Sequence, residues 1–422
     1  MAPLPPHAQI DPPCPPAPAA PEGQKPAPFS HRLLEIAAAF LKLGLTSFGG
    51  PIAHLGYLQA EFVAKRRWLD DGAYADLVAL CQFLPGPASS QVVFALGLQR
   101  AGLLGGFVAS LGFTLPSAVL MIAFGYGVVA LVGLESAGWL HGLKLAAVAV
   151  VAQAVWSMGK NLCPDRTRIS MCLLAAAVLL AFPGAVAQIA VIAAGALVGW
   201  GLYRKTVPRV AAAVQVSLRR HIPAAAALAT FFALLVALPL LDSWSGRKPV
   251  AMFDSFYRAG SLVFGGGHVV LPLLRAEVVP RGWVNDNQFL AGYGAAQALP
   301  GPLFTFAGYL GTVMTAGPYA WLGGLWCVLA IFLPAWLLIG GAMPFWGWLR
   351  STAWAQAALR GANAAVVGVL LAALYNPVFT SSVRNTRDVA AALLAFGLLT
   401  ALRAPPWVVV ILMAAAGQWV LT

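Results

Sequence analysis

The sequence has very little charge. Only 9% of its 422 residues are Asp, Glu, Lys or Arg, against about 25% in an average soluble domain. As 60% of the residues are hydrophobic and the mean hydropathy is +0.79, a soluble fold would expose long apolar stretches. The composition therefore excludes a water-soluble enzyme and predicts a protein that spans a membrane several times.

Alternation of polar and apolar residues is also scarce. A membrane β-barrel is built from segments of roughly 10 residues with such alternation. This chain instead has unbroken apolar runs, such as residues 171–182. We therefore expect an all-α polytopic membrane protein.

Motifs for catalysis and metal binding are missing as well. The sequence has no HExxH, GxSxG or GxxxxGK[ST] motif, and its five cysteines and six histidines show no ligand spacing. We predict no enzymatic activity, no cofactor and no metal site. The net charge of +12 comes from short basic loops, which are typical of cytoplasmic membrane faces, and no nucleic-acid-binding motif accompanies them. The expected surroundings are a lipid bilayer, without a nucleic-acid partner.

The first 30 residues differ from the rest of the chain. They contain eleven prolines and no periodic apolar pattern, which predicts a disordered cytoplasmic tail. No basic segment leads into an apolar stretch before residue 33, so a signal peptide is not expected.

An internal repeat organises the remainder. FLKLGLTSFGG at 40–50 corresponds to FYRAGSLVFGG at 256–266, and QFLPGP at 82–87 corresponds to QALPGP at 297–302. Later, LHGLKLAAVAV at 140–150 corresponds to LRGANAAVVGV at 359–369. The predicted domains are residues 31–203 and 250–422, joined by residues 204–249, which contain a basic loop and one extra apolar segment at 222–241.

That extra segment predicts the symmetry of the repeat. If each copy crosses the membrane an even number of times, one linking helix starts the second copy on the opposite face, giving inverted-topology repeats. The N-terminus is then cytoplasmic and the C-terminus periplasmic.

Several apolar segments are too short to cross a membrane. In the first copy, residues 33–48, 52–64, 72–84 and 88–99 each fall below the ~20 residues of a span. We interpret them as two re-entrant hairpins, which places the basic loops on one face, followed by full crossings near 101–131, 137–157, 169–183 and 185–203. A chain in which every short segment crosses, with up to thirteen spans, remains an alternative.

Glycine and proline interrupt these segments at matching places in both copies. Irregular backbone at membrane depth is found where protein or a water-filled cavity satisfies it, and a helix starting there offers free N–H groups to an anion. Close helix packing is the simpler alternative. The predicted substrate site comprises Ser47, Gly49, Gly50, Pro51, His54, Gln82, Pro85, Gly86, Pro87, Ser89 and Ser90 in the first copy, and Gly265, Gly266, Gly267, His268, Gln297, Pro300, Gly301, Pro302 and Thr305 in the second.

Ionisable residues within apolar segments complete the candidate site, because their burial is costly. Lys42 and Arg258 occupy equivalent positions, and either attract an anion or pair with Glu61 and Glu277, which are candidates for ion coupling. Further cations on one helix of each copy are Lys144 and Arg360, for which snorkelling to the headgroups is the alternative. The two histidines are compatible with a coupling proton or with a buried hydrogen-bonded role.

The sequence resembles one known family. TSFGGPIAHLGYLQAEFV at 46–63, RRWLDDGAYADLVALCQFLPGPASSQ at 66–91 and GFTLPSA at 112–118 are similar to the chromate transporter (CHR) family of the long-chain, two-domain type. LVFGGGHVVLPLL at 262–274 and QALPGPLFTFAGYLG at 297–311 resemble its second domain. The proline-rich tail lies outside the resemblance.

The resemblance implies a function. It predicts a secondary transporter that exports chromate across the bacterial inner membrane and gives chromate resistance, with sulfate as a related oxyanion. From the residues alone, a passive anion channel or a transporter of another small oxyanion or carboxylate is an alternative. The sequence leaves open whether the chain forms a homodimer.

Overall fold

The computed structural model describes residues 28–48, 50–130, 138–205, 222–264, 267–315, 317–345 and 352–419. Within these ranges the regular structure is helical and no strand occurs. Most of the proline-rich tail, residues 1–27, and three residues of the predicted site, Gly49, Gly265 and Gly266, lie outside the described ranges. The chain is a multi-pass membrane protein: among the described residues, six helices are long and apolar enough to span a bilayer, namely Ala88–Val129, Gly138–Leu162, Val186–Tyr203, Ile222–Ser245, Ala320–Phe345 and Ala353–Ser382.

The helices follow the repeat. The first copy consists of α1 (Phe29–Thr46), α2 (Gly50–Gln59) with its π-helical extension η1 (Ala60–Lys65), α3 (Asp71–Phe83), α4 (Ala88–Ala130), α5 (Gly138–Leu162), α6 (Arg166–Ala181) and α7 (Ala185–Tyr203). The linking helix is α8 (Ile222–Ser245). The second copy consists of α9 (Lys248–Ser261), η4 (Gly267–Val269), α10 (Val270–Val278), α11 (Asp286–Ala298), η5 (Leu303–Thr305), α12 (Phe306–Met314), α13 (Ala320–Ala342), η6 (Met343–Phe345), α15 (Ala353–Ala373), η7 (Leu374–Phe379), α16 (Thr380–Ser382), α17 (Thr386–Thr400) and α18 (Pro406–Trp419).

Helix α4 is a hairpin of two arms. Its backbone leaves the helical region at Ala101 and at Gly102, where φ is +67°. After this turn Gly105 lies against Gly97, and Gly106 lies against the ring of Phe94, so the arms run antiparallel. The long helix therefore reverses at 101–102, between the segments 88–99 and 101–131 expected from the sequence. In the second copy α12 and α13 pack together in the same way, with Gly311 against Gly323.

The first hairpin also turns back on itself. Arg66, which follows η1, contacts Glu35 near the start of α1 at 3.0 Å, and Arg100 at the α4 turn contacts the same carboxylate at 3.1 Å. The ends of both short hairpins thus lie beside the beginning of α1. This placement agrees both with two re-entrant hairpins and with short segments that cross the membrane in pairs.

The two copies interlock. Helix α5 of the first copy packs against α17 and α18 of the second, and α15 of the second packs against α6 and α7 of the first. Glycines allow this approach: Gly142 lies against α18 at Met413, and Gly361 lies against Gly195 and Gly199 of α7. Equivalent helices thus make equivalent contacts across the repeat.

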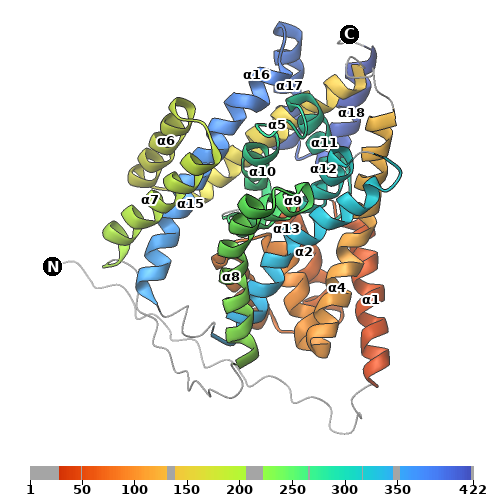
Figure 1. The fold of residues 1–422 in the computed structure, drawn as a ribbon, viewed down its shortest axis with the longest axis vertical. Coiled ribbons are helices and arrows are strands. Elements are labelled where there is room, and N and C mark those ends of the chain that lie inside the picture. Colours follow the sequence, from red (N-terminus) through yellow and green to blue (C-terminus); the bar gives the residue numbers. More distant parts are fainter. Residues whose placement is uncertain are drawn as a thin grey trace, which may run out of the picture.

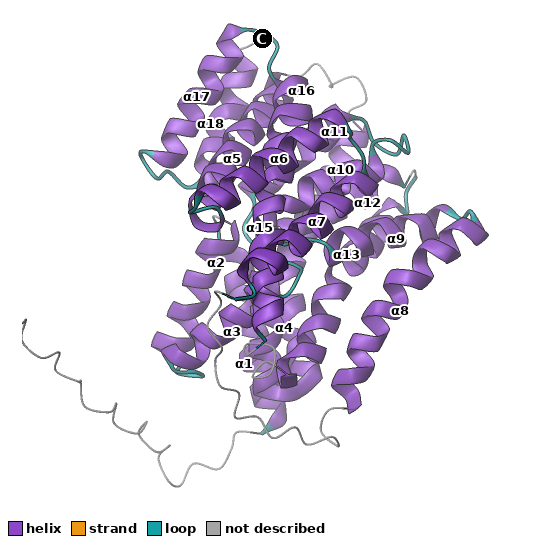
Figure 2. Ribbon diagram, turned by 90° about the vertical axis from the view of Figure 1, so that its left-hand side faces the viewer, coloured by secondary structure: helices purple, strands orange, loops and turns teal. Residues whose placement is uncertain are grey.

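The ends of the helices mark two ends of the molecule. Helix α1 begins at the lower end of Figure 1, whereas α18 finishes at the upper end. The linking helix α8 starts at the lower end and rises to about the middle of the molecule, where α9 begins, and Figure 2 shows the same course.

Candidate functional site

The four helix interruptions meet in two reciprocal pairs. The N–H of Gly301, in the second break of the second copy, donates to the carbonyl of Ser47 in the first break of the first copy at 2.9 Å. In the equivalent bond, the N–H of Gly86 donates to the carbonyl of Val263 at 2.7 Å. Because Ser47 corresponds to Val263 and Gly86 to Gly301, each copy completes the broken backbone of the other.

Only glycine suits the donor positions. The φ angles of Gly86 and Gly301 are +118° and +94°, a region that side chains disfavour. A Cβ atom at Gly86 would also lie 2.8 Å from Nε2 of Gln91, and one at Gly301 would lie 2.7 Å from the hydroxyl of Ser117. The flanking prolines have no N–H group, so the glycine amide is the donor available in each Pro-Gly-Pro sequence.

A buried histidine ties the first break to α4. His54 is 1% exposed, and its Nε2 lies 3.1 Å from the carbonyl of Ser47. A carbonyl only accepts, so Nε2 carries the proton and Nδ1 accepts from the hydroxyl of Ser89 at 3.5 Å. At the second break of the same copy, the side-chain amide of Gln91 donates to the carbonyl of Pro85 at 2.7 Å.

The start of α4 offers free donors. Its first N–H groups, from Ala88 to Ser90, precede the first bonded one, in which Gln91 N donates to Pro87 O at 2.9 Å. The hydroxyls of Ser47 and Ser90, which are 1% and 4% exposed, have no hydrogen-bond partner within the described residues, and neither has Oε1 of Gln91. Helix N-terminus and hydroxyl donors together provide an arrangement that can hold an oxyanion without a side-chain charge.

The equivalent place in the second copy is apolar. Phe304 and Phe306 replace Ser89 and Gln91, and both are buried. The hydroxyl of Thr305 is already bonded to the carbonyl of Pro302 at 2.8 Å. His268 lies in η4 and bonds to the hydroxyl of Tyr293 at 2.8 Å. Within the described residues, the two buried hydroxyls without a partner that lie beside these breaks, those of Ser47 and Ser90, therefore belong to the first copy, whereas the second copy has the buried amide nitrogen of Gln297 without one.

Glutamines that match in sequence do not match in environment. Gln82 of α3 is exposed, whereas Gln297 of α11 is 9% exposed. Of the other predicted site residues, Gly50 and Pro51 form the first turn of α2 and Gly267 starts η4. The four prolines of the site, Pro85, Pro87, Pro300 and Pro302, flank the bonded Gly86 and Gly301.

Lys42, in the second half of α1, belongs to a network of charged side chains. Its ammonium is 3.9 Å from Glu61, and its side chain is 58% exposed. Glu61 is bound more closely by Arg66 at 2.8 Å and by Lys65 at 3.5 Å. Lys42 thus approaches a carboxylate and lies at the surface of the protein.

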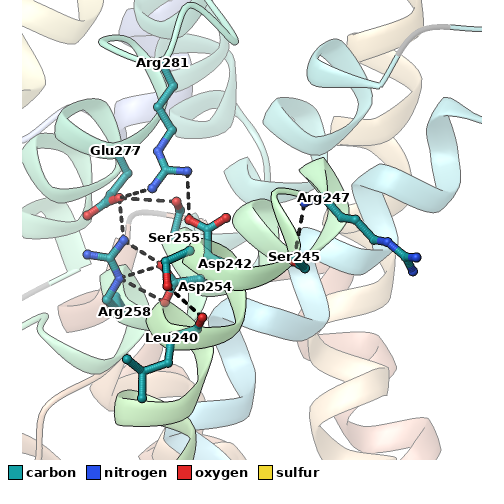
Figure 3. A network of polar contacts seen from close by, with 10 residues as sticks. Leu240, Asp242, Ser245, Arg247, Asp254, Ser255, Arg258, Glu277 and Arg281 are labelled. Atoms are coloured by element: carbon teal, nitrogen blue, oxygen red, sulfur yellow. Dashed lines mark hydrogen bonds and ion pairs between the residues drawn. The ribbon is translucent and has the colours of Figure 1, made fainter.

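Arg258 lies in a more buried network (Figure 3). Its guanidinium donates to both oxygens of Asp254 at 2.8–3.1 Å and to Glu277 at 2.9 Å. Glu277 also accepts from the hydroxyl of Ser255 at 3.3 Å. Sequence reasoning missed Asp254 and Ser255, which stand on the same face of α9 as Arg258 but match no polar residue in the first copy.

Two further cationic side chains of α5 contact other helices. Lys144 of α5 is 2% exposed and donates to the side-chain oxygen of Asn287 at 3.1 Å. His141, one turn earlier, lies 2.8 Å from the buried carboxylate of Asp388 in α17. Arg360 of α15 is partly exposed.

Known proteins share this sequence pattern. The sequence profile of the chromate transporter family matches residues 34–200 and 250–418, one match for each copy. A chromate transport protein of Pseudomonas aeruginosa is 33% identical over 312 residues, which cover 74% of this chain and 72% of that protein. A chromate transport protein of Cupriavidus metallidurans is 28% identical and is covered to 86%, with 87% of this chain aligned. An uncharacterized transporter of Methanocaldococcus jannaschii is 25% identical over 80% of this chain.

No solved structure matches the chain. The family profile covers most of the sequence, and its two matches begin and end close to the two interlocked helical copies. The chain belongs to the chromate transporter family.

Proposed function

We propose that this protein is a secondary transporter that exports chromate across the bacterial inner membrane, thereby giving resistance to chromate, and that sulfate is a second substrate. The reciprocal bonds from Gly301 to Ser47 and from Gly86 to Val263 carry the proposal. They gather four interruptions from both copies at one place, beside buried hydroxyls that lack protein partners. A tetrahedral dianion bound there is held by the start of α4, Ser47 and Ser90.

We also propose that the two copies are inverted-topology repeats. The basic residues at the ends of the first hairpins lie beside the start of α1, which supports a cytoplasmic lower end. Because the linking helix α8 is long and apolar enough to cross the bilayer once, the second copy enters from the periplasm and α18 finishes there. The proline-rich tail is then cytoplasmic, and residues 31–203 and 250–422 form the two domains.

The inward-negative membrane potential favours this direction of transport. Moving one charge across it changes the free energy by about 2.3 kcal/mol per 100 mV, hence by roughly 4.6 kcal/mol for a dianion. Export of chromate is thus favourable without ATP. Access alternates when the joined breaks expose the α4 site first to one end and then to the other.

Everted membrane vesicles test the proposal. Labelled chromate should accumulate in vesicles that contain the protein when an inside-positive potential is imposed, and excess unlabelled sulfate should suppress the uptake. Accumulation driven by a proton gradient at zero membrane potential excludes a passive channel, since the potential alone would also concentrate a dianion through a channel. Absence of uptake by folded protein refutes chromate as the substrate.

Two serine and threonine variants test the site. Ser90→Ala removes a buried hydroxyl without a protein partner and should raise the KM for chromate roughly tenfold, the effect of losing about 1.4 kcal/mol. Thr305→Ala at the equivalent position is the matched control, because that hydroxyl already bonds to Pro302. Equal KM values for both variants would contradict a site in the first copy.

A further inference from the structure

Each copy contains the same triad of charges. In the first copy Glu61 lies between Lys42 at 3.9 Å and Lys65 at 3.5 Å. In the second copy the equivalent Glu277 lies between Arg258 at 2.9 Å and Arg281 at 4.0 Å. One glutamate with two cations beside it is thus common to both copies.

The surroundings of the two triads have opposite charge. Arg66 and Arg100 join the first triad together with Glu35, so that this network has four cations and two carboxylates. Asp254 and Asp242 join the second, which then has three carboxylates and two guanidinium groups. When all groups are ionised, the first network carries an excess of two positive charges and the second an excess of one negative charge.

Glu277 competes with a second carboxylate for each of the two cations of its network. Asp254, which is 1% exposed, receives three contacts from Arg258, and Asp242 receives Nη1 of Arg281 at 3.2 Å. Glu277 contacts Nη2 of Arg258 and Nη2 of Arg281, and Figure 3 shows the two guanidinium groups approaching it from two sides. All its contacts, including that from Ser255, are made by one oxygen, Oε2.

Two cavities lie near this carboxylate. Glu277 and Arg258 line a small cavity together with Gln188 of α7. Gln188 also lines a larger cavity of about 270 Å³ between the α6–α7 turn, α10 and η7. The charged residue lining that larger cavity is Arg275, which is bound to Asp286 at 2.7 Å. Gln188 is thus common to both cavities, so water that enters the larger cavity comes within one side chain of the cavity beside Glu277.

We propose that Glu277 is the carboxyl group that binds the coupling proton of transport, and that Glu61 remains ionised. Guanidinium groups keep their protons, so the surplus negative charge of the second network is removed when a proton from water adds to the Glu277 carboxylate. The same addition to Glu61 would increase the positive excess of the first network. The coupling role rests on the transport function proposed above, while the proton site does not.

Protonation has a mechanical consequence. A neutral Glu277 no longer attracts Arg258, which keeps its contacts with Asp254, so the link between α9 and α10 weakens. Arg258 lies five residues before Val263, whose carbonyl holds Gly86. A proton that binds to Glu277 therefore loosens one of the two joined breaks, in exchange for the release of an anion.

Infrared difference spectroscopy of the purified protein in lipid, without chromate, tests the proton site. Between acidic and alkaline buffer the wild type should show the carbonyl band of a protonated carboxyl group, which Glu277→Gln removes and Glu61→Gln retains. Thermal unfolding shows whether Glu277→Gln is folded. If it is misfolded, Glu277→Asp is measured instead, and its carbonyl band should lie at a different frequency from that of the wild type. A band that persists in folded Glu277→Gln, or that does not move in Glu277→Asp, overturns the proposal.

Vesicle uptake tests the coupling. Wild-type transport should change with pH by up to about tenfold per unit, as expected for one titrating group, whereas Glu277→Gln should vary by less than about twofold. The same strong pH dependence in Glu277→Gln overturns the coupling role. If the band is lost in Glu277→Gln but the wild type takes up no chromate, the proton site stands and the chromate function fails.

Discussion

Gly86→Ala tests whether the joined breaks are required for transport. A methyl group at this position strains a backbone with φ of +118°, at a cost of about 1–2 kcal/mol. It also meets Nε2 of Gln91 at 2.8 Å, and displacing that amide breaks its bond to Pro85, which adds about 1 kcal/mol. The sum of about 2–3 kcal/mol lowers the population of molecules in which residue 86 bonds to Val263 roughly 30- to 150-fold, relative to conformations without this bond.

The assay is chromate uptake into everted vesicles, with thermal unfolding of the purified protein beside it. We expect uptake by Gly86→Ala to fall at least about tenfold, because chromate binding requires the bond between residue 86 and Val263. Gly127→Ala in α4 is the matched control, since no atom lies within 4 Å of the added Cβ and alanine favours a helix. Wild-type uptake and stability in Gly86→Ala would refute the argument that this bond shapes the site.

Three further predictions concern charge, packing and topology. Arg258→Ala should impair transport and stability more than Lys42→Ala, by about 3–5 kcal/mol in unfolding free energy, since it leaves buried carboxylates without their cation, whereas Lys42 is largely exposed; equal effects in thermal unfolding and uptake would contradict this. Gly361→Leu should prevent α15 from packing on α7 and abolish folded protein in size-exclusion chromatography, whereas Gly201→Leu, with open space around it, should leave a monodisperse peak. A cysteine placed after Leu421 should react with a membrane-impermeant reagent added to intact spheroplasts, and reaction only after lysis would contradict inverted repeats.

The sequence was informative about local structure. Gly and Pro at fixed offsets predicted the breaks because these residues act on their own backbone. The segments 33–48, 52–64, 72–84 and 88–99 correspond closely to α1, α2 with η1, α3 and the first arm of α4 for the same reason. The repeat predicted that every such feature occurs twice.

The pairing of these features could not be predicted. Nothing in the sequence near Ser47 indicates that its carbonyl receives the amide of Gly301, because the bond depends on how distant helices pack. The roles of Lys42 and Arg258 also diverged: their positions match, but Asp254 and the neighbouring α8 enclose only Arg258. Gln82 and Gln297 differ in burial although the motif around them is the same.

Helices α5 and α15 each pack mainly on helices of the other copy, and this packing determines which parts of the molecule can move as rigid bodies. One body contains α5 to α7 and α15 to α18, and a second contains the hairpins α1 to α4 with α8, α9, α12 and α13, because the most extensive packing lies within these two sets. Each body is drawn from both halves of the chain. A sliding or rocking step therefore runs along a seam that cuts across the repeats, and separating the halves themselves would pull apart the most closely packed helices of the protein.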